Sequence, residues 1–328
     1  MLDPAIAAVR FAVREVLQPF ADSGAAVLVA LSGGADSLAL AAATAHEAPK
    51  LGLTVVTATI DHALQQGSDE VAARAADQAR EAGVPDARIA CVEVGTQGGP
   101  EAAARDARYA ALARAAADAD AVAVLLGHTL DDQAETVLLA LARGAGAGSL
   151  QGMAPRRIDE RGLVWLRPLL PLRRSETRAF CAAAGIEAWD DPHNTDERFS
   201  RVRVRSTVMP VLESELGPGI AEALARTAEQ LREDSDAFAD IIDETIEDIV
   251  EHAEAGIAIS AAALEANPPA IRNRIIRHVA LSEFGESLTR RHTLEIARLV
   301  TDWHGQGPID LPGFTAQRRG GLVVLAAR

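Results

Sequence analysis

The strongest constraint on the fold is an alternation of apolar runs with helical patterns between residues 26 and 142. The apolar runs predict strands at Ala26–Leu31, Leu53–Ile60, Arg88–Val94 and Ala121–Leu126. The intervening patterns predict helices at Asp36–His46, Ser68–Ala82, Pro100–Ala117 and Leu130–Ala142. Strands that alternate with helices predict a parallel sheet covered on both faces. Because ligands bind at the carboxyl ends of such strands, we expect a site in the loops after Leu31, Ile60 and Leu126.

The second half of the chain is predicted to be more helical. A short strand at Leu163–Leu166 precedes a helix capped by Ser175 that ends before Gly185, and a helix over Arg201–Leu216, kinked or broken near Pro210. The Gly217-Pro218-Gly219 run then marks a boundary. The remainder predicts a long acidic helix, helices at Ala261–Phe284 and Thr289–Trp303, and strand-like ends within Ile309–Ala327. We therefore expect two domains, 1–216 and 217–328.

The charge of the chain is unevenly distributed. The net charge of −15 by itself argues against a nucleic-acid partner. However, the segment Glu229–Glu254 holds eleven acidic residues and one arginine, whereas Arg143–Arg205 holds twelve arginines and eight acidic residues. The middle of the chain is therefore locally basic and compatible with phosphate. Three further arginines, Arg272, Arg274 and Arg277, fit a contact with nucleic acid and a solvated helix face equally well.

Composition also limits location and metal chemistry. No apolar run has the roughly 18 residues that a membrane helix needs, and the amphipathic N-terminal segment lacks the features of a signal peptide. We therefore expect a cytoplasmic protein without membrane contact. The two cysteines, Cys91 and Cys181, lie far apart and favour two buried thiols over a zinc site or an iron–sulfur cluster.

The run Ser32-Gly33-Gly34-Ala35-Asp36-Ser37 lies directly between a predicted strand and a predicted helix. Its glycines let the backbone approach a polyanion, and the helix N-terminus offers free N–H groups. The serine hydroxyls add donors, and Asp36 suits a Mg²⁺ ion that bridges phosphate oxygens. The alternative is a glycine turn with a Ser/Asp cap. The run differs from the Walker sequence because no Gly-Lys-Ser follows.

A second motif, Gly127–Thr136 (GHTLDDQAET), also follows a predicted strand. Asp132 and Glu135 are three residues apart, so they share one face of a helix. Two carboxylates beside a phosphate site could bind a metal or a cationic substrate. The alternative is the ordinary acidity of a helix start, with Thr129 or Asp131 as the cap.

The first motif resembles the pyrophosphate-loop (PP-loop) ATPases, which cleave ATP to AMP and pyrophosphate. This group includes GMP and asparagine synthetases, tRNA thiolases and lysidine synthetases. Gly127–Met153 resembles the signature of the tRNA(Ile)-lysidine synthetase family, short form. Further matches follow in order at Asp61–Leu64, Glu101–Tyr109, Arg167–Leu170 and Asp191–Arg205. The resemblance implies a PP-loop, Rossmann-like α/β fold of the adenine-nucleotide α-hydrolase type, followed by a mostly helical tRNA-binding domain.

The resemblance also implies roles for residues. Nucleotide binding falls to Ser32, Gly33, Gly34, Ala35, Asp36, Ser37, Asp61, His62 and His128, with Asp36 holding magnesium. The catalytic set is Asp36, Arg108, Asp132, Glu135 and Arg205, of which Arg108, Asp132 and Glu135 would contact lysine or the reacting centre. Contacts with tRNA or the leaving phosphate fall to Arg201, Arg203 and Arg205.

The implied reaction has two steps. The carbon-2 oxygen of the first anticodon cytidine attacks the α-phosphate of ATP, and the ε-amine of lysine then displaces AMP. The implied partners are isoleucine tRNA with a CAU anticodon and lysine, and the resemblance allows a homodimer. Our hypothesis for the base is Asp132, ahead of His128.

Three alternatives stay open. A tRNA thiolase that acts on cytidine would need clustered cysteines, which this chain lacks. An amidotransferase-type synthetase would need a glutaminase nucleophile, for which no pattern is present. An inactive RNA-binding module would need a damaged loop or acid pair, whereas both are intact. Release of pyrophosphate that depends on tRNA separates an enzyme from a binding module.

Overall fold

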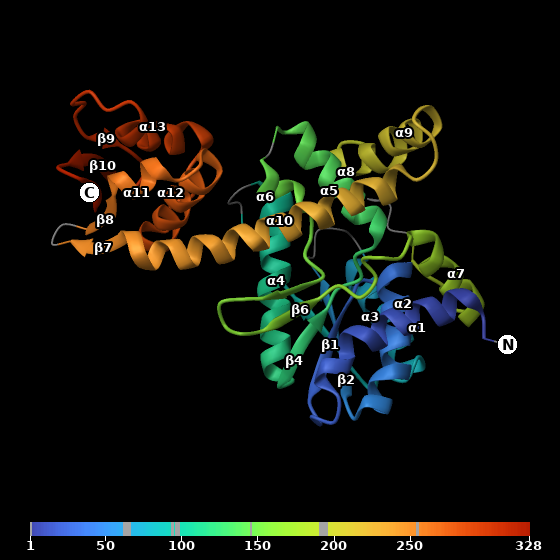
Figure 1. Cartoon of the computed structure of the whole chain (residues 1–328). Coiled ribbons are helices and arrows are strands. Elements are labelled where there is room, and N and C mark those ends of the chain that lie inside the picture. Colours follow the sequence, from blue (N-terminus) through green and yellow to red (C-terminus); the bar gives the residue numbers. More distant parts are fainter. Residues whose placement is uncertain are drawn as a thin grey trace. The chain divides into compact units, whose positions relative to one another are not determined.

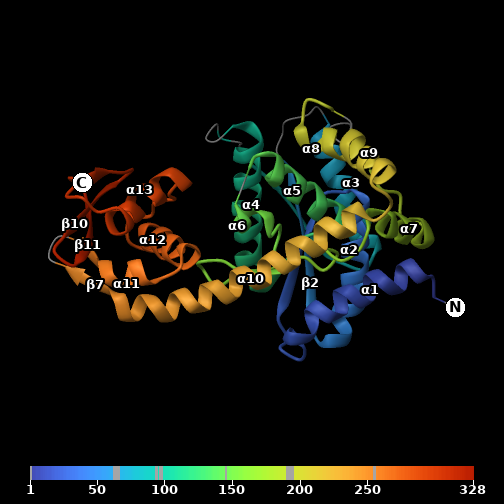
Figure 2. The ribbon, with the colours of Figure 1, turned by 45° about the horizontal axis from the view of Figure 1, so that its top comes forward.

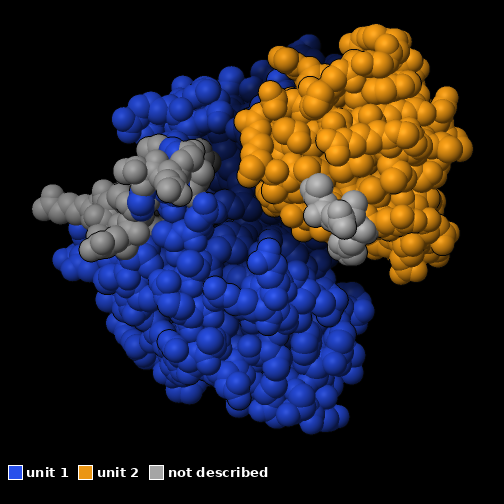
Figure 3. Space-filling model, turned by 90° about the vertical axis from the view of Figure 1, so that its left-hand side faces the viewer, with its two compact units in different colours: residues 1–231 blue, residues 232–328 orange. Residues whose placement is uncertain are grey.

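The computed structural model describes residues 2–61, 67–92, 95, 99–144, 146–189, 196–253 and 256–328, without the side chains of 100–102 and 252–253 (Figure 1). The chain divides into two compact units, Met1–Leu231 and Arg232–Arg328, which Figure 3 colours separately. No helix in the described part of the chain is long and apolar enough to cross a membrane.

Unit 1 contains the predicted parallel sheet. Its strands are β1 (Ala26–Leu31), β2 (Thr54–Asp61), β3 (Asp86–Cys91), β4 (Ala121–Leu125), β5 (Arg156–Ile158) and β6 (Val164–Leu166). They lie in the order β3-β2-β1-β4-β6-β5. All neighbours are parallel except β5, which pairs antiparallel with β6. Strand order reverses between β1 and β4, so the loops after these two strands open into the same crevice.

The helices of unit 1 cover both faces of this sheet (Figures 1 and 2). Those before residue 185 are α1 (Pro4–Leu17), α2 (Ala35–Glu47), α3 (Ser68–Glu81), α4 (Pro100–Asp118), α5 (Leu130–Ala142), α6 (Ala147–Leu150) and α7 (Arg174–Ala184), with short 3₁₀ turns at Gln18–Phe20 and Ala48–Leu51. Helix α1 begins as Asp3 accepts a hydrogen bond from the Ala5 N–H at 2.8 Å and Pro4 takes the first helical position.

Alternating residues of the central strands pack into two separate cores, one on each face of the sheet. On β1, the side chains of Val27 and Val29 pack with α1, α2, α3 and α7. Those of Leu28 and Ala30 pack with α4 on the opposite face. This alternation follows from the two-residue period of a strand, and it explains why β1 is apolar throughout its length.

The region predicted as one helix over Arg201–Leu216 is interrupted. Helix α8 (Ser200–Arg203) passes into a π-helical turn at Val204–Val208 and then into α9 (Met209–Glu215). The irregularity therefore lies before Pro210, which sits in the first turn of α9, where its missing N–H costs nothing. Helix α10 (Ile220–Ile249) follows the predicted glycine-rich boundary.

Unit 2 combines helices with a small antiparallel sheet. Its strands β7 (Val250–Ala253), β8 (Gly256–Ser260), β9 (Ile309–Asp310), β10 (Phe314–Arg319) and β11 (Leu322–Ala327) lie in the order β7-β8-β11-β10-β9. Its helices are α11 (Ala261–Ala266), α12 (Pro269–Phe284) and α13 (Arg290–Thr301). The predicted helix Ala261–Phe284 is therefore two helices, because Pro268 and Pro269 cannot continue α11. Strands β7 and β8 were not predicted.

The prediction that both cysteines are buried is right for Cys181 and wrong for Cys91, which is exposed. Cys91 is the last residue of β3, and β3 is the edge strand of its sheet. Because an edge strand is covered less than a central one, an apolar side chain there can face solvent.

Candidate active site

The PP-loop connects β1 to α2, as the sequence predicts. The Ser37 hydroxyl donates to the Gly34 carbonyl at 2.9 Å and accepts from the Ser32 N–H at 3.1 Å and the Ser32 hydroxyl at 3.0 Å. Gly33 has a φ of +80°, which glycine adopts without strain. These bonds fold the loop over the start of α2, so that backbone N–H groups of the first helical turn face the cavity.

The loop after β4 approaches the PP-loop closely. A β-carbon on Gly127 would lie 3.2 Å from the carbonyl carbon and oxygen of Asp36 and 3.3 Å from Cα of Ser37. All three are backbone atoms, which cannot move as a flexible side chain would. Gly127 is therefore the residue that lets the two ligand-binding loops meet.

The two carboxylates of the second motif are buried on α5. Asp132 is 9% exposed and Glu135 is 1% exposed. Asp132 Oδ2 accepts from the Thr129 N–H at 2.9 Å and from the Thr129 hydroxyl at 3.0 Å. Asp132 thus completes a capping box at the start of α5, while its Oδ1 faces the arginines of the site.

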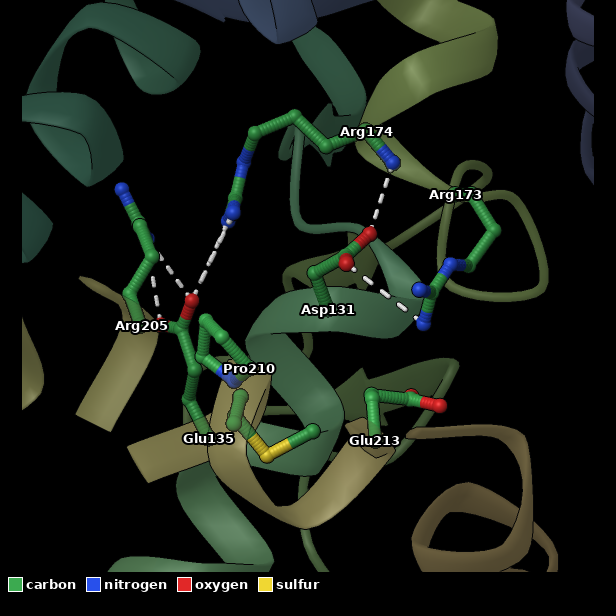
Figure 4. A pocket seen from close by; sticks show the side chains of 8 residues that line it. Asp131, Glu135, Arg173, Arg174, Arg205, Pro210 and Glu213 are labelled. Carbon is green, nitrogen blue, oxygen red and sulfur yellow. Dashed lines mark hydrogen bonds and ion pairs between the residues drawn. The ribbon is translucent and has the colours of Figure 1, made fainter. Parts of the chain in front are cut away.

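Three arginines surround this carboxylate pair. Arg205 contacts Glu135 with two nitrogens, at 2.7 and 3.1 Å, and Arg201 Nε contacts Glu135 Oε2 at 3.0 Å. Arg174 Nη2 contacts Asp132 Oδ1 at 2.9 Å, and its Nη1 lies 3.4 Å from Glu135 Oε1. Figure 4 shows Arg174 and Arg205 reaching Glu135 from two sides. Burial would raise the pKa of Asp132, but Arg174, Arg201 and the Thr129 N–H outweigh it, so that pKa is lowered.

Asp36 lies at the first turn of α2 and contacts α7. Its Oδ1 accepts a hydrogen bond from the Thr177 hydroxyl, and its Oδ2 lies 3.5 Å from Arg174 Nε. Burial raises the pKa of Asp36, and the contacts with Thr177 and Arg174 counteract part of that effect. A further cation bound beside Asp36 would lower the pKa of this carboxyl.

The donor set at Asp36 fits magnesium only together with phosphate. In the described part of the chain, no group of three or more His, Cys, Asp and Glu side chains could hold a metal ion. Mg²⁺ is commonly bound by one or two carboxylates together with substrate phosphates and water. Asp36 beside the PP-loop supplies such a carboxylate, so the residues present fit a Mg²⁺ ion that arrives with ATP.

Most of the predicted site residues line one cavity of about 610 Å³. It includes Ser32, Gly34, Ala35, Asp36, Ser37, Arg108, His128, Asp132, Arg201 and Arg205. Glu135 lines an adjoining cavity of about 180 Å³. Gly33 lies in the same loop outside the lining of either cavity, and Asp61 is buried at the end of β2, also outside it. His62 lies outside the described residues.

Arg203 is separated from the other two arginines of its run. Its guanidinium donates to the backbone carbonyls of Glu197 at 2.6 Å and Arg198 at 3.0 Å. Arg201 and Arg205 are four residues apart and reach the carboxylates together, whereas Arg203 projects from a different side of the same helical segment.

His128 and Arg108 both line the cavity. His128 Nδ1 is buried without a hydrogen-bond partner in the described structure. Burial lowers the pKa of His128 to about 3, so the imidazole is neutral. Burial also lowers the pKa of Arg108, Tyr109 opposes this, and the charge of Arg105 adds to it. Arg108 lines the cavity, where its positive charge suits an anionic ligand.

Sequence reasoning missed the contribution of α7. Arg174, Arg178 and Trp189 line the cavity, and Thr177 contacts Asp36. Residues 174, 177 and 178 share one face of α7, and that helical spacing was the available signal. The spacing alone did not identify the face that turns toward the PP-loop.

Comparison with known proteins agrees with this geometry. Residues 8–212 match the family model described as a PP-loop domain, and residues 259–323 match the model described as a TilS substrate binding domain. The solved structure of the U34-tRNA thiolase NcsA from Methanococcus maripaludis, with its [4Fe-4S] cluster, aligns with a TM-score of 0.59 at 19% identity, over 70% of this chain and 80% of that chain. This likeness concerns the fold alone.

Curated relatives are similar over nearly the whole chain. The tRNA(Ile)-lysidine synthase of Leifsonia xyli subsp. xyli is 57% identical over 92% of this chain and 89% of its own. The enzymes of the same name from Thermobifida fusca and Streptomyces coelicolor are 49% and 46% identical, over 99% and 98% of this chain and 98% of each relative. With the PP-loop domain, the buried carboxylate pair and this extent of identity, the chain belongs to the tRNA(Ile)-lysidine synthase family.

Proposed function

We propose that the protein uses ATP and Mg²⁺ to ligate lysine to carbon 2 of the first anticodon cytidine of isoleucine tRNA with a CAU anticodon. The product, lysidine, converts the reading of AUG to that of AUA. The observation that carries this proposal is the position of the carboxylate pair Asp132 and Glu135. They lie buried on α5, next to the cavity that holds the PP-loop.

In the first step, the cytidine O2 attacks the α-phosphate of ATP and pyrophosphate leaves. Ser32, Ser37 and the N–H groups at the start of α2 would bind the phosphates, and Arg108 would neutralise charge that develops on them. Asp36 would hold Mg²⁺, which supplies charge neutralisation to the phosphates when bound. Adenylation converts the carbonyl oxygen into a good leaving group.

In the second step, the ε-nitrogen of lysine forms a bond to carbon 2 and AMP leaves with the oxygen. Asp132 and Glu135 would receive the ε-ammonium, which must lose a proton before it attacks because lysine has a pKa of about 10.4. We assign that proton to Asp132. His128 is a weaker candidate because its buried imidazole is neutral and does not attract the ammonium as a carboxylate does.

The tRNA contacts would come from two regions. Arg201 and Arg205 line the cavity, where a phosphate or the cytidine enters, and Arg203 extends the same basic run. The C-terminal region 217–328 would bind the body of the tRNA. Arg274, Arg277 and Arg290 support this assignment, because the charges of Arg274 and Arg290 both act on Arg277.

The experiment that tests the proposal is incorporation of labelled lysine into an unmodified isoleucine tRNA transcript with a CAU anticodon, with ATP and Mg²⁺. The matched control transcript carries uridine at the first anticodon position. Label in the cytidine transcript alone supports this tRNA as the substrate, lysine as the nucleophile and cytidine as the nucleobase that is modified. Cleavage of ATP without label in either transcript would indicate another nucleophile or RNA. The homodimer that the resemblance allows is tested separately by sedimentation.

Asp132→Asn tests the assigned proton acceptor. We expect more than a tenfold loss of turnover, because the amide carries no charge and cannot accept the proton. Single-turnover transfer of lysine to adenylated tRNA is the measurement, made at a temperature at which thermal unfolding shows the variant to be folded. A tenfold or smaller loss would contradict the role of Asp132 as the base.

A further inference from the structure

Arg174 contacts all three carboxylates of the site. Its Nε lies 3.5 Å from Asp36, its Nη2 lies 2.9 Å from Asp132, and its Nη1 lies 3.4 Å from Glu135. Its side chain is 17% exposed, and it lines both cavities. One guanidinium therefore joins the carboxylate beside the PP-loop to the pair on α5.

The charge of this cluster is already balanced by the protein. Three carboxylates, Asp36, Asp132 and Glu135, face three guanidinium groups, those of Arg174, Arg201 and Arg205. The ε-ammonium of lysine would add a fourth positive charge to a buried site. Because a buried unpaired charge is costly, the ammonium can bind well only if an arginine gives up its carboxylates.

Of the three arginines, we expect Arg174 to be the one that gives up its contacts with Asp132 and Glu135. In the described structure, Arg201 and Arg205 contact Asp132 and Glu135, whereas Arg174 alone also reaches Asp36. The Arg174 backbone N–H donates to Asp131 Oδ2 at 2.7 Å (Figure 4). A movement of its side chain would therefore leave the main chain in place. A nucleotide bound in the adjoining PP-loop would bring phosphate groups close to Arg174. The N–H groups of its guanidinium can donate hydrogen bonds to the phosphate oxygens.

We propose that Arg174 is a positioning residue that couples nucleotide binding to lysine binding. Without nucleotide, its guanidinium occupies the carboxylates that the lysine ammonium needs. When ATP binds, the phosphates attract Arg174, and Asp132 and Glu135 become free for lysine. This inference rests on the proposed function, since it takes lysine as the amine that these carboxylates receive.

The test is the affinity for lysine, measured by calorimetry on the full chain, with and without Mg²⁺ and α,β-methylene-ATP. We expect the wild type to bind lysine at least tenfold more tightly with the nucleotide. In Arg174→Met, the carboxylates are free in both states, so the ratio of the two affinities should fall below threefold. Arg174→Gln, which keeps a hydrogen-bond donor without the charge, should behave alike and serves if the methionine variant does not fold.

Arg173→Met is the matched control. Arg173 is the neighbouring residue, but its guanidinium lies 3.5 Å from Asp131 and 3.6 Å from Glu222, and Figure 4 shows it on the opposite side of Asp131 from Glu135. This variant should keep the wild-type ratio. Equal lysine affinity of the wild type in both states, or a tenfold ratio retained in Arg174→Met, would overturn the coupling. Absence of lysine binding in both states, together with no labelled lysine in tRNA, would instead refute the proposed function.

Discussion

At the scale of single residues, the site is built from charges that stabilise one another before any ligand binds. Glu135 is 1% exposed, and an isolated carboxylate at such a depth would be strongly destabilising. Bidentate contact with Arg205 and a further contact with Arg201 offset that cost. Removal of either partner leaves the other charge buried, so substitutions in this cluster affect folding and binding at once.

Gly127 offers a cleaner test at the same scale, because it carries no charge. In Gly127→Ala, the new methyl group would lie 3.2 Å from backbone atoms of Asp36. We expect the PP-loop to shift, with a loss of about 1–3 kcal/mol in the free energy of unfolding. Release of pyrophosphate that depends on tRNA should fall at least tenfold. Urea unfolding and a pyrophosphate assay measure the two effects.

Gly148→Ala is the control for this prediction. A β-carbon on Gly148, in α6, would have no atom within 4 Å. It should change the free energy of unfolding by no more than about 0.5 kcal/mol and leave pyrophosphate release as it is. If Gly127→Ala releases pyrophosphate as fast as the wild type, the close approach of the two loops is unimportant for the cleavage of ATP.

At the scale of elements, α2 links the PP-loop to the N-terminal helix. Its first turn follows Gly34, and its last residue, Glu47, is fully buried. Glu47 accepts hydrogen bonds from Arg10 at 2.6 Å and Arg14 at 2.8 Å, both on α1, and from Lys50 at 3.2 Å. The helix that presents the phosphate-binding loop is thus anchored at its far end by a buried charge network.

This network predicts a pH dependence of stability. Burial would raise the pKa of Glu47, but the hydrogen bonds from Arg10, Arg14 and Lys50 lower it to about 2, against an ordinary value of 4.5. Because the folded-state pKa is the lower one, the stabilisation is fully present above about pH 4.5 and is lost as the pH falls toward 2. We expect Glu47→Gln to be less stable than wild type by about 3 kcal/mol at pH 7, and the difference to shrink below pH 4.5.

Urea unfolding of both proteins at pH 7, 5, 4 and 3 measures this difference. Glu81→Gln is the control, since Glu81 is an exposed residue at the end of α3. Its stability should follow that of the wild type within about 0.5 kcal/mol at each pH. A Glu47→Gln deficit that is the same at pH 7 and pH 3 would show that packing, not charge, accounts for the effect.

At the scale of the whole molecule, unit 2 brings several arginines together although the chain as a whole is strongly acidic. The chain carries a net charge of −15, yet in unit 2 the charges of Arg274 and Arg290 both act on Arg277. Partial desolvation lowers the pKa of Arg277, and the charges of Arg274 and Arg290 lower it further. The repulsion between these like charges in the free protein is reduced when a phosphate backbone binds beside them.

We therefore expect Arg277→Gln to weaken binding of isoleucine tRNA and to lower the slope of log affinity against log salt by about 1. Filter binding over a range of salt concentrations is the measurement. Arg298→Gln is the control, because Arg298 is paired with Asp302 at 3.2 Å. An unchanged slope in Arg277→Gln would assign the cluster to a solvated surface.

The local elements of unit 1 and the two catalytic loops followed from sequence because their signals are local. Apolar runs, the serines and glycines of residues 32–37 and the acid spacing at 132 and 135 act through near neighbours. In unit 2 the sheet was only partly predicted. Strand β8 owes its stability to pairing with β11, whose register joins Val323 to Ile259, more than sixty residues away. Such pairing leaves little trace in a five-residue strand.

The sequence by itself determined that a parallel α/β domain carries a phosphate-binding loop, an acid pair and arginines able to meet phosphate. Only the tertiary structure decided how these charges pair. It turns one face of α7 toward the PP-loop, brings Arg201 and Arg205 to Glu135, and directs Arg203 elsewhere. The reason is physical: the partner of a buried charge depends on which helix faces pack together, and that packing joins residues far apart in the chain.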